Sequence, residues 1–373
     1  MTRDRDTDDI KQGLKREIKS LCKKLLPDGR EQGRLWVSHN PVTSDYDKSP
    51  ELKVALTRDI GAWRCWRADE KGDVIGLIQY VKRCDFREAM DFARDFLGIR
   101  RMTREQYQRF QQVVQADREQ EDEQAEQKRL KRLQAAERLF HLGYQDGAGS
   151  AAEAYALRYF AARAIPLETI PNRDRATMRF SSATEYWRRA EYRNDGGRRI
   201  KVKPGPEYPA VHTAMRTDSG QIAAVHCTFL SPLGPKKLPV GKDESAKLMF
   251  GEAKGAMIRI SHGPEGEPPE TAMVPQPLIL CEGIEDGLSL ARACPEARVW
   301  AAGSLSAMAS APIWLPCVSV VIVAKDNDWS NRTAERQFER VLEAIAAAGK
   351  PITTIASHVG KDFNDMAQEG DEE

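Results

Sequence analysis

The stretch VSVVIVAKDND, residues 318–328, joins a run of mostly apolar residues directly to a cluster of acidic ones. Two other stretches repeat this pattern, PLILCEG at 277–283 and PITTIASHVGKDFND at 351–365. Short, nearly continuous apolar runs that alternate with helical segments are typical of parallel strands buried on both faces of a sheet. The run ARVWA at 297–301 adds a fourth strand, so the sequence predicts an α/β domain with a parallel sheet over 271–373.

The acidic residues Glu282, Asp326, Asp328 and Asp362 each follow an apolar run. The carboxyl ends of parallel strands meet at one edge of a sheet, where reactive groups gather in open α/β folds. Asp326 and Asp328 are two residues apart, so on an extended chain they project to the same side and can share a hard cation. We therefore predict a Mg²⁺ (or Mn²⁺) site that includes Glu282, Asp326 and Asp328, with Glu282 placed to activate a hydroxyl or water. Taken alone, Asp362 or Asp365 is read as a helix N-cap or a solvated turn.

The 373 residues contain 57 Lys and Arg against 56 Asp and Glu, so the whole chain gives no electrostatic indication of nucleic-acid binding. Residues 158–203 are locally basic, however, with twelve Lys and Arg against five acids and with interleaved aromatic residues. Such a combination can neutralise phosphates and stack bases, although an arginine-rich surface over ordinary core aromatics fits equally well. The candidate nucleic-acid contacts are Arg188, Arg189, Arg198, Arg199 and Lys201.

Several motifs are missing from the sequence. The seven cysteines form no C-x-x-C pair, which argues against a disulfide framework and an intact zinc ribbon. No G-x-x-x-x-G-K-[ST] occurs, so a helicase motor would need a separate protein. Apolar runs are too short to cross a bilayer and the first residues lack a signal peptide, so we expect a cytoplasmic protein without membrane contact.

Two segments connect the ends of the chain. Residues 101–147 are rich in Gln and in charges of both signs, and the part up to 138 lacks Gly and Pro, which predicts a charged helical linker exposed to solvent. A coiled-coil dimer is the alternative, but no sustained heptad appears. Residues 148–270 combine a helical stretch with short strand-like runs, which predicts a basic α+β module.

The stretches CEGIEDGLSL, VIVAKDNDWSN and GKDFNDM, within residues 277–366, resemble the motifs of the Toprim domain of phage and plasmid primases. The resemblance implies that Glu282 is a general acid or base and that Asp326 and Asp328 are metal ligands. It also implies that Lys361 and Asp362 make accessory contacts to phosphate and metal. Toprim domains also occur in type IA topoisomerases, OLD-type nucleases and recombination proteins, so Mg²⁺-dependent polynucleotide chemistry is implied more firmly than any single reaction.

Residues 1–100 resemble the zinc-binding domain at the start of bacterial-type primases, in a degenerate form. Trp36 and Ala68 stand at two of the four ligand positions, and only His39 and Cys65 match. Two ligands do not make a structural zinc site, so we expect no zinc unless Asp69 or Cys84 replaces the lost ligands. The core of this module is then expected to include Trp36, Trp63, Trp66, Ile75, Ile78 and Phe92.

Together these features predict an α/β and α+β multidomain protein. The expected function is that of a primase-like nucleotidyltransferase that makes short primers on single-stranded DNA from nucleoside triphosphates during replication of a phage, plasmid or other mobile element. A separately encoded replicative helicase would then be a partner. The alternatives are a Toprim nuclease acting on DNA or RNA and a non-catalytic DNA-binding accessory protein of replication.

Overall fold

The structure is a computed structural model that describes residues 2–42, 50–195, 198–327 and 332–370. The chain forms two compact units, one of residues 1–127 with 194–200 and the other of residues 128–193 with 201–373. The expected multidomain α/β and α+β architecture is confirmed. No helix within the described residues is long and apolar enough to span a membrane.

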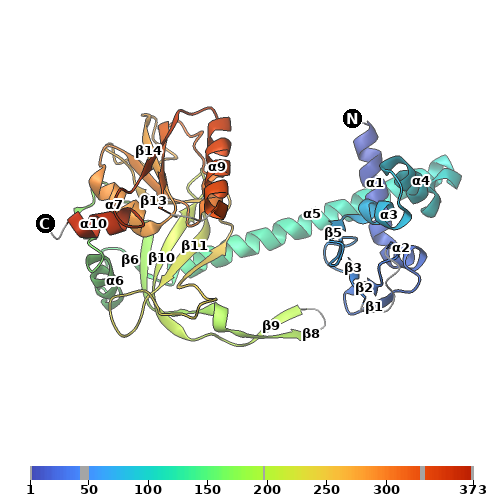
Figure 1. Ribbon diagram of the computed structural model, residues 1–373, viewed down its shortest axis with the longest axis horizontal. Helices are drawn as coiled ribbons and strands as arrows, with labels where there is room; N and C mark the ends of the chain where they lie inside the picture. Colours follow the sequence, from blue (N-terminus) through green and yellow to red (C-terminus); the bar gives the residue numbers. More distant parts are fainter. Residues whose placement is uncertain (1, 43–49, 196–197, 328–331, 371–373) are drawn as a thin grey trace. The chain divides into compact units, whose positions relative to one another are not determined.

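The first unit contains an antiparallel sheet whose strands follow one another in chain order (Figure 1). Its strands are β1 (Arg30–Gln32), β2 (Leu35–Ser38), β3 (Leu52–Ala55), β4 (Trp63–Cys65) and β5 (Glu70–Gly72). Its helices are α1 (Thr2–Arg16), α2 (Ile18–Leu25), α3 (Val74–Lys82) and α4 (Phe86–Phe96), followed by the 3₁₀ turn η1 (Ile99–Arg101). Sheet and helices share one hydrophobic core. The caps of two helices are local: Asp73 accepts bonds from the first turn of α3, and Asp85 forms a capping box with Glu88 in α4.

The expected core of this unit is confirmed except at one tryptophan. Trp36, Trp63, Ile75 and Ile78 are buried, and Phe92 packs against them while partly exposed. Trp66 was expected in the core, and that expectation is wrong, because 59% of it is exposed. It follows Cys65, whose side chain is buried, and successive side chains of an extended segment point to opposite faces. The Arg64 guanidinium lies 3.8 Å from the centre of the Trp66 ring instead.

The remaining cysteine of the degenerate metal site is engaged by neighbouring side chains. Asn40 Nδ2 lies 3.5 Å from Cys65 Sγ and donates to Tyr80 Oη at 2.8 Å. Trp36, at the position of a lost ligand, donates from Nε1 to the Leu26 carbonyl at 3.3 Å. In the described part of this unit, no group of three or more His, Cys, Asp or Glu side chains is arranged to hold a metal ion.

We predict that purified, untagged full-length protein contains well under one equivalent of zinc, because Cys65 is packed against Asn40 rather than against other ligands. Metal analysis checks the content, and a chelator is expected to leave the melting temperature unchanged. One tightly bound zinc per chain would contradict the prediction and would direct attention to Asp69 and Cys84.

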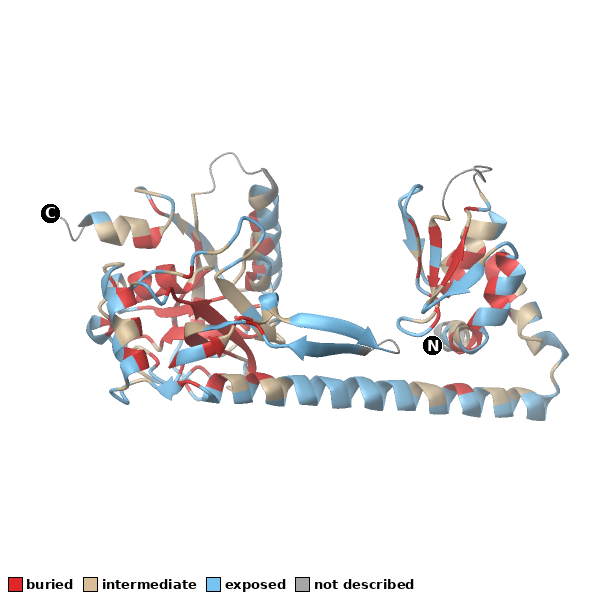
Figure 2. Ribbon diagram, turned by 90° about the horizontal axis from the view of Figure 1, so that it is seen from below, coloured by how far each residue is buried: buried red, intermediate tan, exposed pale blue. Residues whose placement is uncertain are grey.

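The long charged helix expected after residue 101 is present as α5 (Arg104–His141), and most of its length is exposed (Figure 2). Its first part belongs to the first unit, where Asp117 accepts from Arg16 at 2.6 Å and Glu121 accepts from Gln12 at 3.0 Å. Its last turns belong to the second unit and bury Phe140. Both ends of the helix are thus packed, and only its middle is a solvated spacer.

Within the described residues, the second unit is built on a ten-stranded sheet (Figure 1). Strands β14 to β17 pair in parallel in the order β15-β14-β16-β17, which confirms the predicted parallel sheet. Strand β13 pairs antiparallel with both β15 and β10, so the same sheet continues into the preceding part of the chain. The strands are β6 (Tyr144–Gln145), β7 (Met178–Glu185), β10 (Glu207–Arg216), β11 (Ile222–Phe229), β12 (Lys247–Gly251), β13 (Met257–Ser261), β14 (Gln276–Cys281), β15 (Arg298–Ala301), β16 (Val318–Lys325) and β17 (Ile352–Ala356).

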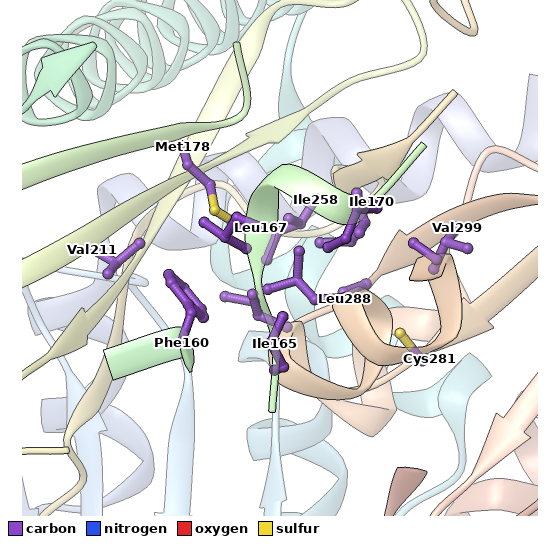
Figure 3. Close-up of a cluster of buried hydrophobic side chains, with 14 of the residues drawn as sticks. Phe160, Ile165, Leu167, Ile170, Met178, Val211, Ile258, Cys281, Leu288 and Val299 are labelled. Atoms are coloured by element: carbon purple, nitrogen blue, oxygen red, sulfur yellow. The ribbon is translucent and has the colours of Figure 1, made fainter. Parts of the chain in front are cut away.

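Helices cover both faces of the parallel part of the sheet. The remaining elements are α6 (Ala151–Ala161), η2 (Leu167–Thr169), η3 (Trp187–Arg189), β8 (Glu191–Asp195), β9 (Arg198–Lys203), α7 (Ile284–Ala293), α8 (Leu305–Met308), α9 (Arg332–Ala347) and α10 (Phe363–Gly370). Alternate residues of β14 point to opposite cores: Ile279 and Cys281 pack with Leu288 of α7 (Figure 3), and Leu278 packs with Phe338 of α9. Burial on both faces is confirmed for β14 and β15, but β17 is an edge strand and stays half exposed.

Candidate functional site

The carboxyl ends of β14 and β16 bring two of the expected acidic residues to one place. Glu282 directly follows β14, and Asp326 directly follows β16, its parallel neighbour in the sheet. Both residues line one small pocket, whose other walls include Met308 of α8 and Phe338 of α9. Asp328 lies outside the described residues.

Hydrogen bonds hold the third acidic segment against the second. The Asn327 backbone N–H donates to the Lys361 carbonyl at 2.8 Å, and Asn327 Nδ2 donates to the Ser357 carbonyl at 2.7 Å. Asp362 begins α10 as its N-cap, since its Oδ1 accepts from the Asp365 N–H at 2.9 Å. The N-cap expected of this residue type and its place beside the other acids are therefore both realised. Lys361 is exposed.

A fourth carboxylate, Asp286, belongs to this cluster and was missed in the sequence. It lies in the first turn of α7, one helical turn after Glu282, and is 6% exposed. Burial raises the pKa of Asp286 to about 7, and the charges of Asp362 and Asp326 add to the shift. Only glycine fits at position 283, where a Cβ would come within 2.2 Å of Asp286 Oδ2. The spacing of four residues in EGIED was the signal that could have found it.

Cys281 lies beneath these acids. Its side chain is buried, as the sequence predicts for a core residue, and its Sγ donates to the Gly283 carbonyl at 3.3 Å. Burial raises the pKa of the thiol well above its ordinary value, and Asp286, Asp326 and Glu282 raise it further. The thiol is therefore neutral and unsuited to act as a nucleophile.

The residue next to Asp286 has the opposite electrostatic environment. Glu285 is 4% exposed, and its two oxygens lie 2.9 Å from Lys237 Nζ and 3.0 Å from Lys247 Nζ. Tyr159 also donates to Glu285 at 2.7 Å. Burial opposes ionisation of this carboxyl, but the two ammonium groups outweigh it and hold its pKa far below the ordinary value. Each lysine side chain is about one-third exposed. No local sequence pattern indicates this cluster, because its members come from distant segments.

The basic patch expected over 158–203 is partly compensated by acids. The Arg189 guanidinium bonds both oxygens of Glu244, at 2.9 and 2.6 Å, and Lys201 Nζ bonds Glu185 at 2.8 Å. Arg188 donates to the Asp243 carbonyl at 2.8 Å. Arg199 lies exposed on β9, and the side chain of Arg198 lies outside the described ones.

The geometry agrees with a comparison against protein families. The model of the Toprim domain matches residues 277–372. These residues are a Toprim domain. A second model, a domain of unknown function (DUF7146), matches residues 131–260, directly before the Toprim domain. A search of curated proteins gives no match to this sequence.

Solved structures similar to this chain include several primases. The Aquifex aeolicus primase, in a structure of its zinc-binding and RNA polymerase domains, is 13% identical with a TM-score of 0.41, and the match covers 97% of this chain and 82% of that one. The E. coli primase catalytic core is 17% identical with a TM-score of 0.42, covering 64% and 75% of the two chains. A DNA primase domain from Pseudomonas aeruginosa is 16% identical with a TM-score of 0.41, covering 64% and 73%.

Asp286→Asn is expected to raise the melting temperature of metal-free protein at neutral pH. The folded-state pKa of Asp286 lies above its ordinary value, so ionisation costs stability as the pH rises from about 4 to about 7, and asparagine avoids that cost. Thermal unfolding as a function of pH checks this. The gain should grow across that range and stay constant above it. A melting temperature that is equal to or below the wild-type value at pH 8 would contradict the prediction.

Glu285→Gln is the matched variant at the neighbouring position, and we expect the opposite sign. The folded-state pKa of Glu285 is lowered, so its ionised form stabilises the protein above the ordinary pKa of about 4.5, and this stability is lost as the pH falls. The variant should therefore melt earlier than wild type at pH 7 and approach it in acid. Equal melting temperatures at pH 7 would show that Lys237 and Lys247 do not stabilise this carboxylate.

Proposed function

We propose that this protein is a primase-like nucleotidyltransferase that joins nucleotides on a single-stranded DNA template with the help of Mg²⁺ or Mn²⁺. The proposal rests on one observation: Glu282, Asp286, Asp326 and Asp362, from three separate segments, converge at the carboxyl edge of a Toprim sheet. Like charges held this close favour a cation, and oxygen donors suit a hard divalent metal.

The residues present fit such a metal. Asp326 is the candidate ligand on β16, with Asp328 as its expected partner, and Asp286 and Asp362 supply further oxygens. Bound there, the metal would neutralise charge on phosphate oxygens during phosphoryl transfer. Glu282, at the end of the adjacent strand, is placed to accept the proton of an attacking hydroxyl. Lys361 is the candidate contact to phosphate from the third segment.

The lysine cluster supports a nucleotide substrate. Lys237 and Lys247 together carry two positive charges against the single charge of Glu285, and their side chains are partly open to solvent. Both lie around α7 from Asp286, whose charge acts on Lys247. An ammonium group in this position suits a negatively charged triphosphate, while Glu285 keeps both lysines extended toward the site.

We expect Asp326→Asn to abolish metal-dependent incorporation of labelled nucleotide on single-stranded DNA while the protein stays folded, since removing one carboxylate also relieves repulsion. Glu282→Gln should still bind metal but lose the chemical step, because an amide cannot accept the proton. Incorporation assays with circular dichroism and metal titration check both variants. Wild-type turnover in Asp326→Asn would contradict the metal assignment, and lost metal affinity in Glu282→Gln would make Glu282 a ligand. Metal-dependent cleavage of the strand without incorporation would favour the Toprim nuclease, and neither activity would favour an accessory protein.

Neutralising Arg188, Arg189, Arg198 and Arg199 together is expected to flatten the salt dependence of single-stranded DNA binding, by about one log unit of slope for each phosphate that an arginine no longer neutralises. Arg189→Ala alone should change it less, because Glu244 already compensates its charge. Binding titrations over a range of salt concentrations test this. An unchanged slope in the fourfold variant would show that the patch does not contact the strand. The primer length, the replicon and a separately encoded helicase remain part of the proposal.

A further inference from the structure

Asn364 is the second residue of α10, two residues after Asp362, and it is completely buried. A buried amide side chain needs hydrogen-bond partners, and those of Asn364 come from two other elements. Its Nδ2 donates to the Arg163 carbonyl, just after α6, at 2.8 Å and lies 3.3 Å from Ser289 Oγ of α7. The residue therefore ties α10 to α6 and α7 together.

The backbone of the same residue contacts the acidic cluster. The Asn364 N–H donates to Asp286 Oδ1 at 3.2 Å. Asp362, which caps the same helix, is one of the charges that raise the pKa of Asp286. A single residue thus links, through its side chain and backbone, the two acids that come from α7 and from the start of α10.

These bonds act against a repulsive force. Asp286 and Asp362 carry like charges, and α10 is a helix of eight residues, too short to be stable without tertiary contacts. Repulsion would move the first turn of α10 away from α7 unless other contacts opposed it. The buried bonds of Asn364, together with the packing of Phe363, oppose that movement.

We propose that Asn364 is a positioning residue, which holds Asp286 and Asp362 at the separation that lets both bind one divalent cation. This inference rests on the proposed function, because it assumes that the acidic edge binds metal. Asparagine suits the position, since its amide donates to two acceptors, whereas alanine would leave the Arg163 carbonyl and Ser289 without this donor.

The test measures Mn²⁺ binding to full-length Asn364→Ala by the electron paramagnetic resonance signal of free Mn²⁺, well below the melting temperature. We expect about tenfold weaker binding, the effect of losing one buried hydrogen bond. The shift of the melting temperature that Mn²⁺ induces should shrink in parallel. Gln368→Ala is the control, because within the described part of the chain Gln368 bonds only inside α10. Its affinity should equal that of wild type.

A purely structural role would lower the melting temperature of Asn364→Ala and leave the Mn²⁺ affinity of the folded protein unchanged, and that result would overturn the inference. If Asn364→Ala does not fold, Ser289→Ala decides, because it removes one acceptor and leaves α10 intact. A smaller loss of affinity supports the inference, and wild-type affinity overturns it. Failure of the wild-type protein to bind Mn²⁺ would overturn the proposed function as well, so the two failures are distinguishable.

Discussion

Mutual repulsion among the carboxylates at the end of the sheet is the constraint on which the second unit depends. Glu282 and Asp326 are fixed by adjacent parallel strands, whose side chains are buried in cores on either side. A strand held in this way cannot move to relieve a charge. The electrostatic cost therefore appears as a raised pKa of Asp286 rather than as a change in structure. A site of this kind is prepared for a cation before the cation arrives.

Two neighbouring carboxylates on α7 show how the fold assigns different properties to similar residues. A step of one residue turns a helix by about 100°, so Asp286 faces the acids while Glu285 faces the lysines. The pKa of the first is raised and that of the second is lowered. Burial disfavours the charge of both, and only the nearby charges decide the outcome. Adjacent positions on one helix can thus serve a metal and a phosphate group in the same site.

The sequence was sufficient where one short segment determines the structure. Apolar runs predicted β14, β15 and β16, and the residues after them marked the acidic edge, because strand ends meet whatever the rest of the chain does. It was insufficient where a property depends on distant segments. Lys237 and Lys247 reach Glu285 across 48 and 38 residues, and no local pattern announces that contact. Trp66 was misplaced because hydrophobicity alone does not tell which side of a strand a residue occupies.

The segments that the two family models match are not independent in this structure. Lys237 and Lys247 lie in the segment matched at 131–260, whereas Glu285 lies in the Toprim domain. One hydrophobic core also combines Phe160 of α6 with Leu288 of α7 (Figure 3), and β13 continues the Toprim sheet into β10. Separating the segments would expose this apolar surface and leave Glu285 buried without its counter-charges, which is costly in both respects. The acidic edge therefore takes its ionisation states from the whole second unit, and the chemistry of the Toprim residues is a property of that unit.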